Sequence, residues 1–172
     1  MKQNVFLAIL ILIGFSSCKP KKAIEFREAI VKKERTAFAI IVGKEGPGEK
    51  RRYSLVENDF KRAALATDEE ERALDSLIRD IQILSTEGVK QGEQLKSAAV
   101  NYYIAVKELQ AYSRREIEQQ VINAGSDREK IYKAQDSLYR LAVNKEELYN
   151  KVYKKEAAFQ EALRKFEIAN NI

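Results

Sequence analysis

Several residue types on which enzymes and cofactor sites depend are missing from this chain of 172 residues, or nearly so. It contains no histidine, no tryptophan and one cysteine, with only two prolines and seven glycines. Without histidine the chain lacks the commonest general base and the usual catalytic zinc ligand. The same absence excludes a di-iron bundle, which needs paired Glu-x-x-His segments. A lone cysteine excludes a disulfide framework within the chain.

Charged and apolar residues make up most of the sequence instead. Charged residues account for 33% and hydrophobic residues for 45%, and the net charge is +5. This composition, with so few helix breakers, is typical of long amphipathic helices. Basic and acidic side chains alternate along the chain, which indicates solvated helix faces rather than a basic stripe for nucleic acid. We therefore expect no nucleic-acid partner.

An apolar stretch opens the chain. Lys2 supplies a positive start, Val5 to Phe15 form an apolar run of 11 residues, and Ser16 and Ser17 precede Cys18. The run is too short for a transmembrane helix, which needs about 20 residues. A positive start, a short apolar run and small residues are typical of a cleaved signal peptide. We predict a signal peptide at residues 1–17.

The segment Phe15-Ser16-Ser17-Cys18 resembles the lipobox of bacterial lipoproteins. In that family the cysteine thiol receives a diacylglyceryl group and becomes the N-terminus after cleavage. The resemblance covers the first 18 residues and departs from the family at Phe15, where leucine is most frequent. It implies lipidation of Cys18 and a membrane anchor, because each buried methylene contributes about 0.8 kcal/mol. An ordinary secretory signal and a retained anchor helix are the alternatives.

Lysines follow the cysteine directly, at positions 19, 21 and 22. In a tether over residues 18–22 they either contact anionic lipid or are simply solvated. Small helical lipoproteins of the Bacteroidota are similar to this chain in layout. In that group, surface export is associated with acidic residues after the cysteine. The resemblance therefore implies a protein that is anchored to a membrane and faces the periplasm.

Residues 23–172 are expected to form one helical domain. Apolar residues at helical spacing predict a first helix over Ala23 to Val42, which ends at a loop rich in glycine over residues 43–48. Those glycines lack the Lys-Ser or Lys-Thr ending of a phosphate-binding loop. A capping box at Ser54 to Glu57 predicts the start of a second helical region. Thr67 to Glu70 repeats that pattern, which predicts a kink near Ala66 to Asp68.

A third helix begins near Leu95 and ends at Asn123-Ala124-Gly125, where Gly125 is the expected left-handed cap. Gly88 and Gly92 indicate a turn before this helix. The apolar spacing over residues 84–95 also fits one continuous helix, and that alternative stays open.

A repeat of seven residues marks the last segment, which restarts at the capping box Ser126 to Glu129 and runs from Asp127 to Asn170, about 65 Å. A helix of this length needs both the second and the third region to cover its seam. We therefore predict an elongated antiparallel four-helix bundle with coiled-coil-like packing. The alternative is three very long helices with a short N-terminal helix. The seam comprises Ile131, Ala134, Leu138, Leu141, Lys145, Leu148, Val152, Lys155, Phe159, Ala162, Phe166 and Ala169.

Few side chains offer a functional site. Tyr132, Tyr139 and Tyr153 share a face beside the seam, as an interaction surface or as the wet edge of the core. Lys145 and Lys155 are expected to extend outward from the seam. The acidic run from Asp68 to Glu71 is interpreted as a helix N-terminus rather than a cation site.

The sequence thus favours an envelope lipoprotein whose bundle is a non-catalytic interaction or structural module, with a protein partner and without metal or cofactor. A periplasmic holdase-like chaperone is the alternative. An enzyme that uses only carboxylates and tyrosines is the third hypothesis, and no segment suggests the pocket that it needs.

Overall fold

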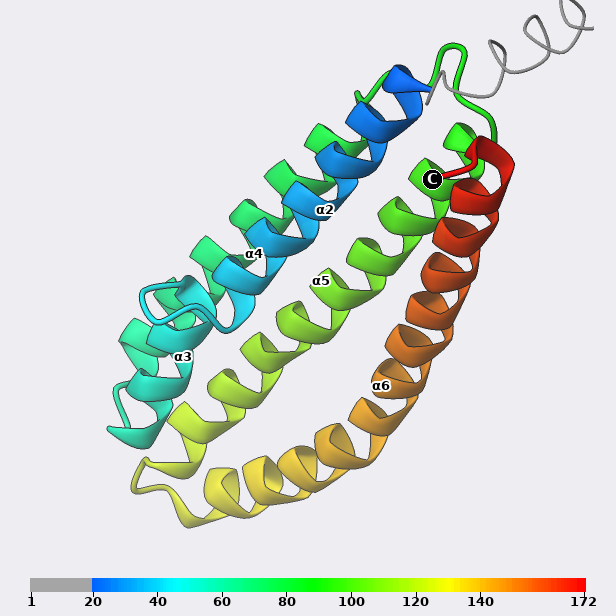
Figure 1. The fold of residues 1–172 in the computed structure, drawn as a ribbon. Coiled ribbons are helices and arrows are strands. Elements are labelled where there is room, and N and C mark those ends of the chain that lie inside the picture. The colour runs from blue at the N-terminus through cyan, green and yellow to red at the C-terminus, as the bar shows by residue number, and fades with distance from the viewer. Residues whose placement is uncertain (1–19) are drawn as a thin grey trace, which may run out of the picture.

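The structure is a computed structural model that describes residues 20–172, so the predicted signal peptide and Cys18 lie outside the described residues. The described part is helical and contains no strand. None of its helices combines the length and apolar character needed to cross a membrane. Its helices are α2 (Lys21–Ile41), α3 (Pro47–Val56), α4 (Phe60–Gln82), α5 (Gly92–Asn123) and α6 (Arg128–Asn170) (Figure 1).

Helix α5 lies at the centre of the bundle. It packs against α4 on one side and α6 on the other, while α2 and α3 pack mainly on α4. The core contains Phe26, Leu77, Tyr103 and Phe159, which come from four helices. The predicted all-α bundle is confirmed, with five helices in the described residues because the second region divides in two. These residues share one hydrophobic core, and the assignment of residues 23–172 to a single domain stays a prediction.

The division of the second region corrects the expected helix start at Ser54. Ser54 lies inside α3 and is buried, whereas α3 begins with Pro47, whose fixed φ suits a first helical position. The chain turns at Asn58, which has a left-handed φ of 58°. Asp59 then caps α4 by accepting a hydrogen bond from the Arg62 amide at 2.9 Å. The capping-box pattern at Ser54 therefore did not mark a helix start.

The kink predicted near Ala66 to Asp68 is also wrong. Helix α4 runs unbroken through this segment, and the Thr67 hydroxyl donates to the Ala63 carbonyl at 2.9 Å instead of capping a new helix. The acidic run from Asp68 to Glu71 consequently lies in the middle of a helix, and its interpretation as a helix N-terminus fails. A Thr-x-x-Glu spacing also occurs within helices, where both residues stay on neighbouring faces.

The connections after α4 and after α5 lie at the residues predicted from the sequence. Residues 83–91 form a turn, in which Gly88 has a φ of 73°, so the continuous-helix alternative for residues 84–95 is excluded. Helix α5 ends at Asn123 as expected, but Gly125 does not adopt the left-handed conformation. Asp127, rather than Ser126, caps α6 by accepting hydrogen bonds from the amides of Glu129 and Lys130.

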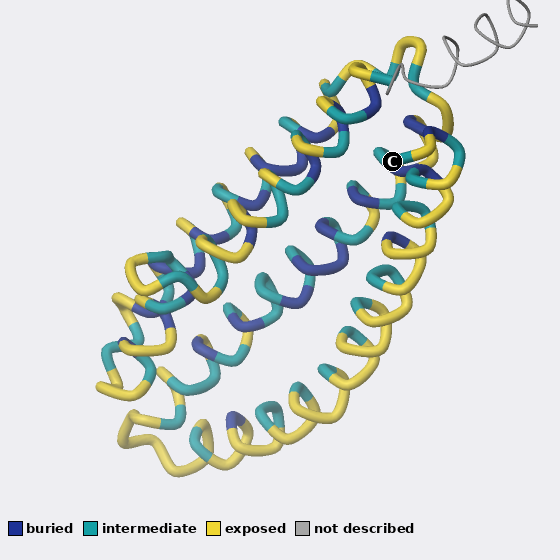
Figure 2. The backbone as a smooth tube through the Cα atoms, viewed as in Figure 1, coloured by how far each residue is buried: buried dark blue, intermediate teal, exposed yellow. Residues whose placement is uncertain are grey.

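Helix α6 confirms the predicted seam, although most of the helix outside that seam is uncovered. None of the twelve seam positions is exposed, and Ala134, Phe159 and Phe166 are buried. The helix bows around α5, which is its main partner, and most of its outer surface faces solvent (Figures 1 and 2). The expectation that the second region also covers this seam is not met, because α4 packs against the other side of α5.

Candidate functional site

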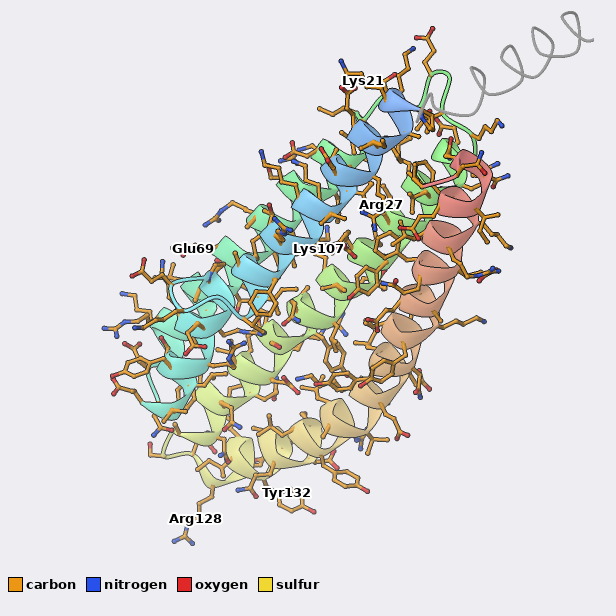
Figure 3. The ribbon with its side chains drawn as sticks, in the orientation of Figure 1. Lys21, Arg27, Glu69, Lys107, Arg128 and Tyr132 are labelled. Carbon is orange, nitrogen blue, oxygen red and sulfur yellow. The ribbon has the colours of Figure 1, made fainter. Side chains whose placement is uncertain are left out.

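Helices α2 and α6 come together at only one end of the bundle. There the rings of Phe26 and Phe166 lie 5.6 Å apart, and the Arg27 Nε atom lies 2.6 Å from Glu167 Oε1. Figure 3 shows Arg27 extending from α2 on the side that faces α5. From this contact the two helices separate toward the other end, with α5 between them (Figure 1). The separation opens a groove over α5.

We call this opening the α2–α6 groove. It has a volume of about 290 Å³ and is lined from three helices. Phe38 stands at its mouth and is 67% exposed, although a large apolar side chain on a helix is usually turned inward. Tyr102 and Tyr103 of α5 form part of the wall, where Tyr102 stacks with Phe159 and Tyr103 packs against the same ring at a tilt. The lining residues are Glu34, Ala37, Phe38, Ile41, Val42, Tyr102, Tyr103, Glu156 and Gln160.

Two carboxylates, Glu34 of α2 and Glu156 of α6, line the groove together. Burial raises the pKa of Glu34, and the charge of Arg27 opposes that rise. The pKa of Tyr102 is also raised, first by burial and then by the negative charges of Glu156 and Glu34. Burial raises the pKa of Tyr103 in the same way. The groove is therefore apolar, aromatic and electrically negative.

These two carboxylates differ from others that lie between helices. Eight carboxylates of the described residues form an ion pair with a lysine or arginine of another helix. Among them, Asp75 lies 2.7 Å from Lys107, Asp80 lies 2.7 Å from Lys33, Glu116 lies 2.6 Å from Lys145 and Glu167 lies 2.6 Å from Arg27. Within residues 20–172, no lysine or arginine forms an ion pair with Glu34 or Glu156. The groove thus holds two carboxylates that have no ion-pair partner in the described chain, and only the more distant charge of Arg27 acts on Glu34.

The three tyrosines selected from the sequence lie on the outer side of α6. Tyr132, Tyr139 and Tyr153 are 75%, 71% and 63% exposed, and Figure 3 shows Tyr132 pointing away from the bundle. At 3.6 residues per turn they face away from the seam rather than standing beside it. We call these residues the tyrosine face. Their exposure does not fit the wet edge of a core, and their role as an interaction surface stays a prediction.

A buried ion pair joins α3 to α4. Arg51 Nε lies 3.3 Å from Glu70 Oε2, and the side chains are 8% and 0% exposed. Arg51 also donates to the Gln110 side chain at 2.7 Å, but both Glu70 oxygens and the Ser54 hydroxyl lack a hydrogen-bond partner among residues 20–172. Burial raises the pKa of Glu70, and the Arg51 charge opposes that rise. This pair thus links the short helix α3 to α4 through buried charges.

The remaining residues selected from the sequence are two seam lysines and the acidic run, and most of them form ion pairs within the bundle. Lys145 is half-buried and paired with Glu116, and Lys155 is half-buried at the edge of a cavity with Glu93 and Asn101. In the acidic run, Asp68 pairs with Arg114 and Glu69 with Lys50. No group of three histidine, cysteine or acidic side chains in the described range is arranged to hold a metal ion.

Comparison with known proteins adds no family to this description. No protein-family model, curated protein or solved structure matches the chain significantly.

The sequence reasoning missed the α2–α6 groove and the Arg51–Glu70 pair. One signal for the groove was present, because Phe38 occupies a helical position where its apolar neighbours at 37 and 41 already define the inward face. No such signal pointed to Glu34 or Glu156, since a carboxylate on a charged helix resembles any solvated side chain. The pairing of Arg51 with Glu70 was missed because the sequence placed a helix start at Ser54, whereas α3 and α4 meet at residues 57–59.

Proposed function

We propose that this chain is a cell-envelope lipoprotein, anchored by acyl chains on Cys18, whose helical bundle binds a protein partner without catalysis. The observation that carries the proposal is the tyrosine face. Three large side chains project into solvent from one helix, although an exposed tyrosine contributes little to the stability of the fold. Tyrosine combines large contact area with a polar tip and is enriched in protein interfaces.

A lipid on Cys18 would also orient the bundle. Helix α2 begins at Lys21, three residues after the cysteine, and three extended residues span about 10 Å. The start of α2, the 83–91 connection and the end of α6 lie at the same end of the bundle (Figure 1). This end would therefore face the membrane, with Lys21, Lys22 and Lys90 exposed near anionic headgroups. The tyrosine face would extend away from the membrane.

The anchor is tested by the intact mass of the protein extracted from membranes beside a Cys18→Ser variant. We expect loss of residues 1–17 and a gain of acyl mass, both abolished by the substitution. Globomycin, which blocks signal removal from lipoproteins, should cause the precursor to accumulate. A mature protein that is unmodified and freely soluble would refute the anchor.

The orientation is tested with single fluorophores. The chain has one cysteine, which acylation would consume, so Glu87→Cys and Ala124→Cys each introduce one reactive thiol at opposite ends of the bundle. In vesicles that contain spin-labelled lipid, we expect strong quenching at position 87 and little at 124. Equal quenching at both positions would contradict this orientation.

The partner surface is tested by site-specific photo-crosslinking in intact cells. A photoreactive phenylalanine analogue replaces Tyr139 or, as a matched control, Tyr53, which is 58% exposed on α3. We expect a discrete adduct at position 139 that is lost when Tyr132 and Tyr153 are both changed to alanine. The proposal fails if position 139 gives no adduct, or if the adduct forms equally at position 53.

A holdase-like chaperone is the second candidate, favoured by the exposed apolar side chains Phe38, Val42 and Val143 in addition to the tyrosines. A holdase needs an exposed apolar surface that accepts unrelated unfolded chains. It should slow the aggregation of an unfolded client at equimolar ratio. If aggregation proceeds at its unassisted rate, this candidate is removed while specific partner binding stands.

A further inference from the structure

We propose that the α2–α6 groove is a second binding site, which receives an apolar, basic segment of a partner protein in helical form. This inference rests on the proposed partner-binding role but concerns a different surface. The groove faces α5 from between two helices, whereas the tyrosine face lies on the outer side of α6. The two sites can therefore be tested separately.

The negative charge of the groove favours an occupant with positive charge. Glu34 and Glu156 enter the same cavity from opposite helices, and both act on the hydroxyl of Tyr102 between them. Neither carboxylate forms an ion pair within the described residues, and Arg27 acts on Glu34 only from beyond ion-pair distance, whereas the cross-helix carboxylates at 75, 80, 116 and 167 each have an ion-pair partner. A lysine or arginine of the occupant would complete this pattern. Such pairs gain strength when they are partly removed from water.

The aromatic lining suits the same occupant. Phe38 at the mouth and Tyr102 in the wall offer ring faces to a cation, and an arginine or lysine over a ring gains about 0.5 to 2 kcal/mol. Val42, which is 43% exposed, and Ile41 add apolar area beside these rings. An occupant with apolar side chains flanking a basic residue would cover both kinds of surface.

The size of the groove favours a segment of protein over a small molecule. Its 290 Å³ is at the lower limit of small-ligand pockets, which span about 300 to 1,000 Å³. A second cavity of about 470 Å³, which Leu138 and Ala142 line from α6, continues on the same flank of that helix. The distance from Ala142 to Glu156 along α6 is about 21 Å, or four helical turns. A helix of about five turns would reach both cavities, as in other helix-in-groove complexes.

The chain from residue 19 onward, which contains the core, is suited to a direct binding measurement. The probe is a synthetic peptide of about 18 residues with leucine at helical i, i+3, i+4 and i+7 spacing, lysine elsewhere and one tryptophan. Because the protein has no tryptophan, fluorescence reports the peptide alone. Loss of Lys2 from the net charge of +5 leaves +4, so overall charge opposes binding of a cationic peptide. We expect micromolar binding, and at least tenfold weaker binding of the same peptide with glutamate in place of lysine.

Matched variants assign the binding to the groove. Glu34→Gln combined with Glu156→Gln removes two charges with little change in shape, and we expect about tenfold weaker binding and a smaller salt dependence. Phe38→Ala should weaken binding about fivefold or more. The control is Glu28→Gln with Glu147→Gln, which changes net charge equally at exposed positions of α2 and α6 outside both cavities. Circular dichroism confirms that each variant is folded.

Three outcomes would overturn this inference. They are the absence of saturable binding of the lysine peptide up to about 1 mM, equal weakening of binding by the control pair and the groove pair, and unchanged binding in Phe38→Ala. None of these results bears on the crosslink at Tyr139, which tests the proposed partner-binding role independently. Conversely, groove binding without any crosslink at position 139 would refute the tyrosine face alone.

Discussion

The buried pair of Arg51 and Glu70 provides the sharpest energetic prediction. At 3.3 Å and an effective dielectric constant of about 20, the charges attract by about 5 kcal/mol before desolvation is counted. Removing each ion from water costs several kcal/mol, and neither Glu70 oxygen has a hydrogen-bond partner in the described residues. The attraction is therefore largely offset. We expect the intact pair to contribute little net stability.

A double-mutant cycle tests this balance. Arg51→Met alone leaves a buried carboxylate without a partner and should lower the free energy of unfolding by about 3 kcal/mol at neutral pH. Glu70→Met alone leaves Arg51 with its bond to Gln110, so the loss should be smaller, about 1 to 3 kcal/mol. The double variant should lie within about 1 kcal/mol of the wild type. Urea unfolding of residues 19–172, followed by circular dichroism, measures all four proteins.

The pH dependence follows from the raised pKa of Glu70. Because burial raises this pKa above its ordinary value of 4.5, the folded protein binds the proton more tightly than the unfolded chain. Stability from this group is therefore greatest at low pH and is lost as pH rises through the folded pKa. Removing Arg51 raises that pKa further, so Arg51→Met should be less destabilised at pH 5.5 than at pH 8. The reasoning is refuted if the deficit is equal at both pH values, or if the double variant loses the sum of the single losses.

Three further predictions concern stability and use the same unfolding assay. Phe159→Ala should lower the free energy of unfolding by about 3 to 5 kcal/mol, because the side chain is buried against Tyr103. Tyr139→Ala should change it by less than about 0.5 kcal/mol, because that side chain is exposed. Equal effects would mean that α6 packs differently. Asp127→Ala should cost about 1 kcal/mol through loss of the α6 cap, and Ser126→Ala should be neutral; the reverse order would restore the capping box predicted from the sequence. Gly88→Ala should cost about 1 kcal/mol because φ is 73° there, and no loss would show that this turn can adopt another conformation.

The sequence predicted the helical class and the inward face of α6 because both depend on local periodicity. Residues three and four apart share a face in any helix, so the seam from Ile131 to Ala169 could be identified without knowing its partner. The breaks at Gly43 and Gly88 were also local, since they follow from glycine and proline in short polar segments. Predictions of this kind need only the chain's own backbone geometry.

The failed boundaries show where local pattern is ambiguous. Ser54 and Thr67 each stand three residues before a glutamate, as a capping serine or threonine does, yet both lie inside helices. The boundary that the structure uses is Asn58-Asp59, where Asn58 accepts a left-handed φ and Asp59 provides the cap. This signal was available in the sequence. Local pattern does not rank two candidate caps five residues apart, Ser54 and Asp59, because the burial of Ser54 decides between them.

The α2–α6 groove could not be predicted for a different reason. Its lining comes from residues more than a hundred positions apart in the sequence. The groove exists because α6 packs along α5 whereas α2 packs along α4. The contacts of Phe26 with Phe166 and of Arg27 with Glu167 close one end, and the helices separate beyond them instead of sharing a seam. In a tightly closed four-helix bundle Phe38 would be a core residue and Glu34 would have a cross-helix partner. The incomplete closure of the bundle, rather than any sequence motif, is what leaves an aromatic and acidic surface open to a partner.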